Sequence, residues 1–564
     1  MICVNPLDDP AGGLVLKERR RGLPSFRPCP SIGGMGRNES EAVLRWLQGG
    51  APLGGGEVRR IDTHGAVILL AGDRAWKLKK PVRFDYMDFS TTEKRHRALE
   101  AELRLNRRTA PRLYLGLHRV ARAPDGGLAL DGAGETVDWL LEMRRFPDGA
   151  LLEEQAARGR LDEDRLEGDG LIHDLAGHIV ALHGMADPVP LPDGAARLRR
   201  VVEGNAEMMT TFPAALPRED SQRLTGRLRA KLDALAPLLD ARGRKGRIRH
   251  VHGDLHLGNI ALVEGAPVAF DCLEFDAELA TIDVLYDLAF LLMDLWQRGL
   301  AAAANRLLNR YLDLSPDDED GMALLPLFMA VRASIRAHVL AARARQADGQ
   351  GAAEGEARSA RAYLDLALGL LDGMERAPRL VAIGGLSGTG KSTLARLLGA
   401  RLGAPPGARI LRSDVLRKRL AGVAPEAPLP PETYTRDSSE RVYAELGRLA
   451  GRMLDAGCGV ITDAVFASPE EREDIRAVAR DRKARFDGLW LVLPEDGRVA
   501  RVEGRRADAS DADAAVVRAQ TLRHSNRPED WALLDAAGSS TALARRALAA
   551  LGLSSDGTGS PTIS

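Results

Sequence analysis

The sequence predicts two domains of different fold class, an α+β domain followed by an α/β domain with a parallel sheet. The chain has 564 residues, which is too long for one hydrophobic core and favours two to four domains. Strand-like segments precede a long series of helical segments up to about residue 375. Beyond that point apolar strands alternate with helices, which is typical of a parallel sheet covered on both faces.

The first domain is expected to begin with a sheet. Residues 57–80 contain two or three short apolar runs separated by turn signals, which predicts strands. Residues 91–108 are charged, rich in helix formers and followed by Pro111, which predicts a helix. Further strands are expected at 112–123, 127–132 and 137–146, and later helices at 171–184, 222–243, 279–297 and 357–374. Residues 345–359 are expected to be the least structured segment of this helical part.

The second domain is expected to consist of strands and helices in alternation. Its predicted strands lie within residues 379–385, 408–414, 457–466, 486–493 and 531–536, and a helix is predicted at 392–403. The expected division of the chain is a disordered leader at 1–37, the first domain at 38–375, the second domain at 376–553 and a disordered tail at 554–564.

Composition limits the possible partners. Hydrophobic residues make up 45% of the chain and charged residues 28%, as in a soluble globular protein. Lys plus Arg equals Asp plus Glu at 79 each, so no overall charge attracts nucleic acid or an anionic membrane. We therefore expect neither nucleic acid nor membrane as a partner, and the oligomeric state stays open.

The compartment is indicated by the cysteines and the start of the chain. The four cysteines have no CxxC or regular spacing, which argues against a disulfide framework or a zinc site. The start, MICVNPLDDPAGG, lacks the features of a secretory signal, and no later run approaches ~18 uninterrupted apolar residues. We expect a cytoplasmic protein.

A first group of polar residues follows the helical segment at 222–243. The stretch HGDLHLGN at 252–259 places Asp254 and Asn259 five residues apart, and Asp271 ends a later apolar strand. Phosphoryl transfer needs a base near the acceptor hydroxyl, cations across the phosphates and ligands for the metal. Asp254, Asn259 and Asp271 occur in the order of base, metal-binding amide and metal-binding carboxylate.

These residues resemble the aminoglycoside phosphotransferase family, whose catalytic loop reads much like His-Gly-Asp-Leu-His-x-x-Asn before a strand that ends in aspartate. The resemblance implies a two-lobed, protein-kinase-like domain in which Asp254 is the catalytic base and Asn259 and Asp271 hold Mg²⁺. The family's usual proline is replaced by Leu257, which is expected to loosen the loop without affecting the ligands.

The same resemblance implies a lysine that contacts the α- and β-phosphates of ATP. Lys77 is the first candidate and Lys79 the alternative, because strand alternation places both on one face. The carboxylate partner is expected on the next helix, with Glu102 as first choice and Glu100 as second. Asp287 is expected to fix the loop rather than to react.

The acceptor of the first domain is expected to be a neutral or anionic hydroxyl compound, or a protein hydroxyl, and not an aminoglycoside. A polycationic drug requires an acidic pocket, whereas a late helix carries only basic charges: Arg332, Arg336, Arg343 and Arg345.

A second motif, GLSGTGKS at 385–392, matches G-x-x-x-x-G-K-[ST] between an apolar strand and an amphipathic helix. Its backbone N–H groups can surround a phosphate, Lys391 can reach the β- and γ-phosphates, and Ser392 can bind Mg²⁺. The expected nucleotide-binding residues are Gly385, Leu386, Ser387, Gly388, Thr389, Gly390, Lys391, Ser392 and Thr393.

Other candidates follow the strands of this domain. Asp463 ends one strand, where a second carboxylate is needed behind the magnesium. Asp414 and Arg417 are three residues apart, so one helical turn can project both toward an acceptor. This pair resembles small P-loop kinases of the gluconate kinase and polynucleotide kinase type, in which it holds the acceptor hydroxyl.

A lid is expected in the same domain, because three arginines occur at helical spacing: Arg498, Arg501 and Arg505. Lid arginines would neutralise charge on the transferred group, and Arg501 and Arg505 are the candidates for nucleotide contact.

The arrangement as a whole, over about residues 38–550, resembles a bacterial bifunctional family that joins an aminoglycoside phosphotransferase-like domain to a P-loop ATP-binding domain. We expect an ATP- and Mg²⁺-dependent phosphotransferase that acts on small-molecule hydroxyl groups at two sites. Two alternatives stay open: the first domain is a regulatory nucleotide-binding module, or the P-loop domain is a switch or motor NTPase.

Overall fold

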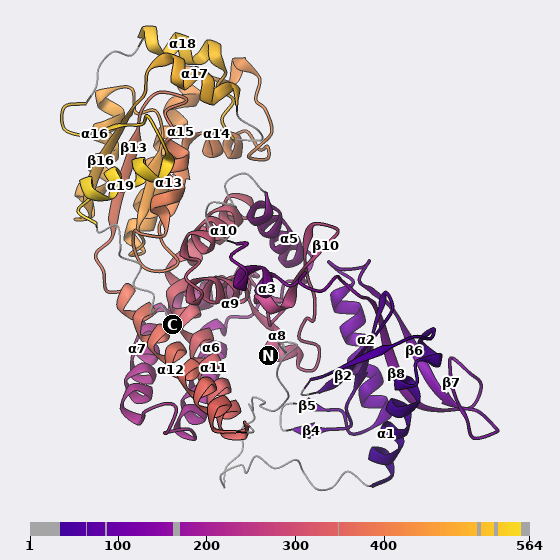
Figure 1. The fold of residues 1–564 in the computed structure, drawn as a ribbon. Coiled ribbons are helices and arrows are strands. Elements are labelled where there is room, and N and C mark those ends of the chain that lie inside the picture. Colours follow the sequence, from indigo (N-terminus) through magenta and orange to yellow (C-terminus); the bar gives the residue numbers. More distant parts are fainter. Residues whose placement is uncertain are drawn as a thin grey trace. The chain divides into compact units, whose positions relative to one another are not determined.

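The computed structural model describes residues 34–63, 65–84, 87–161, 170–347, 349–504, 509–523 and 528–553. The chain forms two compact units, and each is described by itself (Figure 1). Unit 1 comprises Met1–Asp294 and Phe328–Ala367. Unit 2 comprises Leu295–Leu327 and Leu368–Ser564. The chain therefore passes between the units three times.

Unit 1 begins with an antiparallel sheet whose strand order is β1-β2-β3-β8-β6-β7. In sequence order the strands are β1 (Val58–Asp62), β2 (Ala66–Ala71), β3 (Arg74–Lys79), β6 (Tyr114–Arg122), β7 (Leu128–Leu130) and β8 (Glu135–Arg144). The small hairpin β4 (Arg83–Phe84) and β5 (Met87–Asp88) follows β3. The expected sheet with one charged helix is confirmed.

Two helices cover opposite faces of this sheet. Helix α1 (Gly34–Gln48) packs Val43 and Leu47 against one side of β3, where Trp76 and Leu78 point. Helix α2 (Thr92–Asn106) packs on the other side. Because side chains alternate along a strand, Lys77 and Lys79 lie on the α2 side, and this alternation positions the first candidate site.

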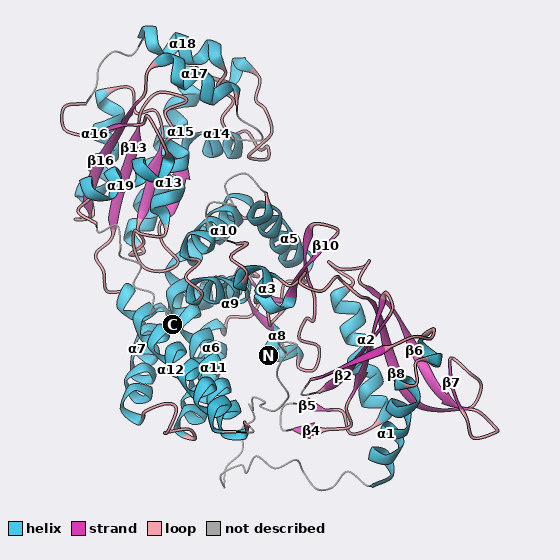
Figure 2. Ribbon diagram, viewed as in Figure 1, coloured by secondary structure: helices cyan, strands magenta, loops and turns pink. Residues whose placement is uncertain are grey.

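The rest of unit 1 is mainly helical (Figure 2). Its helices include α3 (Leu152–Ala157), α5 (Leu171–Met185), α6 (Gly194–Thr210), α7 (Arg218–Arg244) and α8 (Ala277–Ala280). The long helices α9 (Val284–Gln297), α11 (Leu325–Gln346) and α12 (Gln350–Gly373) follow. Short antiparallel pairs join β9 (Ile248–His250) to β12 (Thr281–Asp283) and β10 (Ile260–Val263) to β11 (Ala266–Ala269).

One segment is more ordered than expected. Residues 345–359 were expected to be the least structured segment of the helical part, but α12 begins at Gln350. This segment is rich in alanine, glutamate and arginine, which favour helix strongly enough to accommodate its glycines. Farther along the same helix, Ala360 and Leu364 are fully buried in the core.

Unit 2 contains a five-stranded parallel sheet with the order β14-β15-β13-β16-β17. The strands are β13 (Arg379–Gly384), β14 (Arg409–Arg412), β15 (Val460–Asp463), β16 (Arg485–Val492) and β17 (Ala532–Asp535). The helices between them are α13 (Lys391–Gly399), α14 (Ser413–Leu420), α15 (Arg436–Asp455), α16 (Pro469–Asp481), α17 (Glu495–Glu503), α18 (Ala514–Arg523) and α19 (Ser540–Ala550). The predicted α/β fold with a parallel sheet is confirmed.

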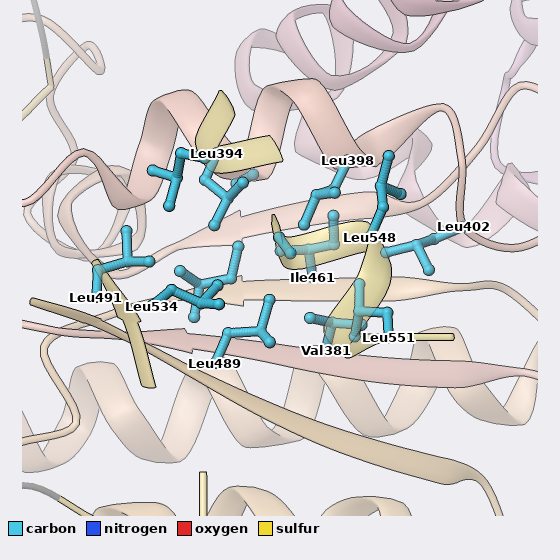
Figure 3. Packing of buried hydrophobic residues seen from close by; sticks show 14 of the residues in the cluster. Val381, Leu394, Leu398, Leu402, Ile461, Leu489, Leu491, Leu534, Leu548 and Leu551 are labelled. Carbon is cyan, nitrogen blue, oxygen red and sulfur yellow. The ribbon is translucent and has the colours of Figure 1, made fainter. Parts of the chain in front are cut away.

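Helices lie on both faces of this sheet, α13 with α19 on one and α15 with α16 on the other (Figure 2). Figure 3 shows the core on the first face, where Leu394 and Leu398 of α13 meet Ile461 and Leu489 of the strands. Because the strands are parallel, their carboxyl ends share one edge, and this edge carries the second candidate site.

Unit 2 also includes helix α10 (Ala301–Leu314) and the 3₁₀ segment η3 (Pro316–Leu324). Two side chains of α10 bond to the edge strand β14 and its approach. Asn305 Nδ2 donates to the carbonyl of Ala408 at 3.0 Å, and Asn309 Oδ1 accepts from Ile410 N at 2.7 Å. These amides satisfy backbone groups that an edge strand otherwise leaves to solvent.

A buried charge cluster reinforces the same contact. The guanidinium of Arg409, on β14, bonds to Glu319 at 2.8 Å and to Asp313 at 2.7 Å. Arg409 and Glu319 are each 2% exposed. Glu319 also pairs with Arg419 of α14 at 3.1 Å. Residues 295–327 are thus integral to the sheet's edge.

One helical stretch, Pro316–Gln346, is long and apolar enough to cross a membrane by length and composition alone. Its apolar part is 89% buried inside the structure, as in a core helix.

Candidate active sites

The first candidate site centres on the loop between β9 and β10. Asp254 and Asn259 are 3% and 0% exposed. Asn259 Nδ2 donates to the backbone carbonyl of Asp254 at 2.9 Å and to its carboxylate at 3.0 Å. The structure therefore brings the predicted base and the predicted amide ligand into direct contact.

Asp287 of α9 anchors this loop. Its carboxylate accepts hydrogen bonds from the backbone N–H of Gly253 at 2.9 Å and of His252 at 3.3 Å. His183 Nε2 of α5 lies 3.2 Å from the same carboxylate. Burial alone would raise the pKa of Asp287, but the contact with His183 lowers it below its ordinary value. Asp287 faces loop backbone, which fits the positioning role expected of it.

The loosened loop expected at Leu257 is not found. The Leu257 side chain is fully buried, and its N–H donates to the carboxylate of Asp294 at 3.1 Å. Proline has no N–H and could not make this bond. Leucine therefore adds a backbone anchor to the loop.

Lys77 and Lys79 both reach Glu102, which is fully buried on α2. Lys77 Nζ lies 2.6 Å from Glu102 Oε1, and Lys79 Nζ lies 2.8 Å from Glu102 Oε2. The alternative partner, Glu100, is exposed on the opposite side of α2. The lysines differ in their second partner, which is Asp271 for Lys77 at 2.7 Å and Glu274 for Lys79 at 2.5 Å.

The backbone at Asp271 is held in an unusual conformation. Its φ of 60° lies in the left-handed region, which few residues other than glycine, asparagine and aspartate adopt. The N–H of Asp271 donates to the Tyr114 hydroxyl at 2.9 Å, and the N–H of Cys272 donates to Asn106 Oδ1 at 3.0 Å. These bonds turn the predicted metal carboxylate toward Lys77.

The electrostatics of this group are strongly coupled. Burial lowers the pKa of Lys77, but Asp271, Glu102 and Glu274 together raise it well above its ordinary value. Burial would raise the pKa of Glu102, yet the two lysines lower it to about 2. Burial raises the pKa of Glu274, and the charge of Glu102 adds to this rise. Lys77 and Glu102 are therefore both charged at neutral pH.

A cavity opens over these groups. It is lined by Thr63, Gly65, Ala66, Lys77, Lys79, Phe89, Asp254, Asp271, Leu273, Glu274 and Phe275. The lining combines apolar side chains with lysines and carboxylates, a combination that suits a nucleotide base and its phosphates.

The second candidate site is the loop between β13 and α13. Gly385 and Gly388 have φ values of 134° and 85°, which L side chains rarely adopt. A Cβ at Gly388 would lie 2.6 Å from the carbonyl oxygen of Arg498, and one at Gly385 would lie 2.7 Å from that of Leu491. Only glycine fits at both positions, so the two glycines fix the tight path of the loop that leads into the N-terminus of α13.

The charged and hydroxyl groups of the motif lie beside Asp463. Ser392 Oγ donates to Asp463 Oδ2 at 2.6 Å, and Arg412 Nε lies 3.5 Å from the same oxygen. Lys391 Nζ bonds to the carbonyl of Leu386, within the loop itself, at 3.3 Å. The structure thus brings Ser392 and Asp463, the two predicted Mg²⁺ ligands of this domain, into direct contact.

Asp414 and Arg417 project from α14, which begins where β14 ends. Burial raises the pKa of Asp414, Arg412 offsets part of this rise, and nearby Asp463 adds to it. Arg417 donates to Ser438 Oγ at 3.0 Å and to Ser439 Oγ at 3.4 Å, and its guanidinium lies over the Tyr434 ring.

The three predicted lid arginines have different surroundings. Arg501 donates to the carbonyl of Thr389, in the P-loop, at 3.0 Å. Arg498 is 2% exposed and donates to Thr521 Oγ1 at 2.6 Å, so it packs α17 against α18. Arg505 lies outside the described residues.

Several residues of the two sites were not found from the sequence. They are Tyr114, Asn106 and Glu274 at the first site and Gln520, whose Oε1 accepts from Ser387 N at 2.8 Å, at the second. Glu274 follows Asp271 by three residues and could have been noted as a further acid. The other three come from distant segments, and no local pattern marks them.

The basic helix that suggested a non-cationic acceptor in the first domain is part of α11. Three of its four arginines lie over aromatic rings: Arg332 over Tyr286 and Phe290, Arg336 over Tyr363 and Arg345 over Phe212. These guanidinium groups pack the helix, so the count of arginines does not by itself bear on the charge of the acceptor.

Comparison with known proteins gives two family matches. Residues 75–325 match the model of the phosphotransferase enzyme family, and residues 380–526 match that of an AAA domain. An adenylyl-sulfate kinase of Myxococcus xanthus is 30% identical over 118 residues, which cover 21% of this chain and 59% of that protein. An amicoumacin kinase structure in complex with AMP-PNP and Ca²⁺ has 15% identity and a TM-score of 0.37, and covers 59% of this chain and 95% of that one.

The match to a mycobacterial protein is far longer. An uncharacterized protein of Mycobacterium tuberculosis is 31% identical over 478 residues, which cover 83% of this chain and 90% of that protein. The match thus extends over both kinase-type domains. The chain therefore belongs to the same family as this mycobacterial protein, one in which a phosphotransferase domain is fused to a P-loop kinase domain.

Proposed function

We propose that the chain is an ATP- and Mg²⁺-dependent phosphotransferase with two sites, each of which transfers the γ-phosphate to a hydroxyl of a small molecule. The observation that supports this most directly is that each unit holds its own set of acid, lysine and metal-type oxygen ligands. When bound, Mg²⁺ would offset the negative charge that develops on the phosphate oxygens.

At the first site, Asp254 would accept the proton of the acceptor hydroxyl. Asn259 and Asp271 offer the amide and carboxylate oxygens that Mg²⁺ prefers. Lys77 would contact the phosphates while Glu102 holds it in place, since the two are 2.6 Å apart. The cavity over these groups supports this assignment.

At the second site, the glycine loop would surround the phosphates, and Lys391 and Arg501 would carry positive charge to the transferred group. Ser392 and Asp463, 2.6 Å apart, would hold Mg²⁺. Asp414 would bind and deprotonate the acceptor hydroxyl, and Arg417 would orient the acceptor. A pair of this kind beside the P-loop favours a small-molecule kinase over a switch NTPase.

Replacing Lys77 with alanine is expected to raise the KM for ATP and to lower kcat at the first site. Together these changes should lower kcat/KM about 100-fold, because a hydrogen bond to a charged group contributes about 1.5–3 kcal/mol. Lys79→Ala is expected to have a smaller effect, since the second partner of Lys79 is Glu274 and not Asp271, the predicted metal ligand. Steady-state kinetics of Asp254-dependent transfer measures both variants. A larger loss in Lys79→Ala would exchange their roles.

The activity of the second site is expected to depend on a carboxylate with a raised pKa. Asp414 must be ionised to accept a proton, and its pKa lies above the ordinary value of about 3.9 because of burial and nearby Asp463. Lys391-dependent turnover should therefore fall on acidification at a higher pH than an ordinary carboxylate would give. A pH–rate profile, with circular dichroism to follow folding, tests this. An acid limb at or below the ordinary value would contradict it.

A further inference from the structure

Helix α11 carries a buried arginine without an acidic partner. Arg332 is 7% exposed, and no acid among the described residues lies within ion-pair distance of it. Its Nε donates to the backbone carbonyl of Tyr286 on α9 at 3.3 Å, whereas its Nη2 is buried and has no hydrogen-bond partner. The Tyr286 hydroxyl is also buried and without a partner. Unsatisfied buried groups of this kind cost free energy, and a buried cation without an anion costs more.

Aromatic rings hold the guanidinium group of Arg332 in place. Its central carbon lies 4.0 Å from the ring centroid of Tyr286 and 4.9 Å from that of Phe290. Ring contacts orient the cation but leave its N–H groups for a ligand. Burial raises the pKa of Tyr286, and Arg332 offsets only part of this rise, so the hydroxyl keeps its proton at neutral pH. Both groups that lack a partner can therefore donate hydrogen bonds.

One acid, Asp287, is near enough to feel the charge of Arg332. Burial would raise the pKa of Asp287, but His183 and, to a smaller extent, Arg332 lower it. The carboxylate of Asp287 is already engaged, because it accepts from the N–H groups of His252 and Gly253 and contacts His183. Asp287 therefore anchors the catalytic loop and does not supply the partner that Arg332 Nη2 lacks.

The Phe290 ring connects this cluster to the predicted base. It packs against the ring of His256, with the centroids 5.1 Å apart. His256 Nδ1 accepts from the N–H of Gly258 at 3.1 Å, so Nε2 carries the proton of the neutral ring. This Nε2 lies 3.7 Å from the carboxylate of Asp254. A continuous series of contacts thus leads from Asp254 to Arg332.

A second arginine of α11 adds positive charge to the same region. Arg336 lies one turn after Arg332, on the same face of the helix, and is only partly buried. Burial lowers the pKa of Arg336, but Tyr363, Asp294 and Asp254 raise it above its ordinary value. The charge of the predicted base therefore acts on Arg336.

The cluster lies outside the predicted nucleotide cavity. Asp254 lines that cavity, whereas none of the lining residues belongs to α9 or α11. An acceptor must meet Asp254 and the γ-phosphate at the same time. With a nucleotide in the cavity, the side of Asp254 that faces His256 is left for the acceptor, and the donors on α9 and α11 are placed to bind its other groups.

We propose that the acceptor of the first site carries a carboxylate or phosphate group besides its reactive hydroxyl, and that Arg332 and the Tyr286 hydroxyl bind this group. The inference rests on the proposed kinase function of the first site and names the class of its substrate. A water molecule or a neutral polyol could satisfy the two donors but would leave the guanidinium charge unpaired. An oxyanion satisfies both donors and the charge together.

The experiment uses the full chain with Lys391→Ala, so that the second site is silent, and supplies ATP with two sets of probes. The first set consists of matched pairs that differ in one charged group: glycerate and glycerol, gluconate and glucitol, glucose 6-phosphate and glucose. The second is a small-molecule extract of bacterial cells, whose new phosphorylated products are identified by mass spectrometry. Only products that disappear when Asp254→Asn is added are assigned to the first site.

We expect every Asp254-dependent product to derive from an anionic acceptor and, within a pair, the anion to exceed its neutral partner at least tenfold in kcat/KM. Tyr286→Phe should raise the KM for that acceptor about 3- to 10-fold, as for one lost hydrogen bond, and leave the KM for ATP unchanged. It removes a hydroxyl that has no partner in the protein, so the thermal unfolding temperature should not fall. Arg332→Met should lower kcat/KM for the acceptor about 10- to 100-fold.

Arg345→Met is the matched control, because Arg345 lies on the same helix over the Phe212 ring but is exposed, and it should not affect transfer. If Arg332→Met does not fold, Tyr286→Phe decides alone. An unchanged acceptor KM in Tyr286→Phe, or a neutral Asp254-dependent acceptor, would overturn the inference and leave the kinase function standing. If neither set of probes yields an Asp254-dependent product, the proposed function of the first site fails, and the inference fails with it.

Discussion

Asp254→Asn is expected to lower phosphoryl transfer at the first site about 10²- to 10⁴-fold, the usual contribution of a general base. The substitution keeps the shape of the side chain. The loop should also keep its fold, since Asn259 bonds to the backbone carbonyl of residue 254 and Asp287 holds two N–H groups nearby. Nucleotide binding at the first site should survive, because the lysine and metal ligands are intact.

Lys391→Ala should give the reciprocal result at the second site. Lys391 is the loop's own cation, and its loss should abolish transfer there while the first site continues to work. A ³¹P-monitored screen of hydroxyl compounds on the wild type and both variants measures the two activities side by side. Glu264→Gln removes one acidic charge from an exposed side chain after β10 and serves as the control, with no expected effect.

The outcome decides between the proposed function and its main alternative. If the first domain were only a regulatory module for the P-loop kinase, Asp254→Asn would remove no transfer of its own, and Lys391→Ala would abolish all of it. If each variant abolishes one set of products and spares the other, the chain carries two independent kinases. Calorimetry should then find two nucleotide equivalents bound to the Asp254→Asn variant.

The sequence predicted those parts of the sites that depend on neighbouring residues. The P-loop is one such case, because its glycines, lysine and serine are contiguous and their conformation is imposed locally. The shared face of Lys77 and Lys79 is another, since it follows from the period of a strand. Even here the choice between the lysines required the distances to Asp271 and Glu274.

Contacts between distant segments could not be predicted. Tyr114 and Asn106 hold the backbone around Asp271, yet they lie more than a hundred residues earlier. The loop at Leu257 shows a different limit. The missing proline suggested a loss of rigidity, but the buried acceptor that the new N–H finds, Asp294, belongs to another helix. Burial and partners at such positions come from the fold, and the pattern of residues does not contain them.

The unit to which residues 295–327 belong could not be predicted from the sequence either. All but the last two of them fall within the span that matches the phosphotransferase family, 75–325, yet they belong to unit 2. Their sequence gives the helical pattern of α10 but no sign of its partner. The contact with β14 is made by individual side chains, namely Asn305, Asn309 and Glu319, and the structure is needed to find it.

Glu319→Gln is therefore expected to destabilise the P-loop unit by about 3–5 kcal/mol, the usual cost of removing one partner of a buried ion pair. Arg409 would keep only Asp313, and Arg419 would lose the acid with which it pairs. Because β14 leads directly into α14, the substitution should also displace Asp414 from its position at the second site. Hydrogen exchange of the full chain should show lost protection in β13, β14 and β15.

Two further variants test whether the loss of stability comes from the burial of the charge at Arg409. Glu440→Gln removes an acid that pairs with Arg436 on the surface, where the side chain of Glu440 is 63% exposed and that of Arg436 is 90% exposed. This change should alter the free energy of unfolding by less than about 1 kcal/mol. The triple variant Arg409→Met, Asp313→Asn, Glu319→Leu should be more stable than Glu319→Gln, because it removes the buried cation together with both of its acids. Unchanged protection in Glu319→Gln would show that residues 295–327 are dispensable. The expected loss means that a chain cut at 376 lacks the acids that Arg409 needs, so the second kinase depends on residues that precede it.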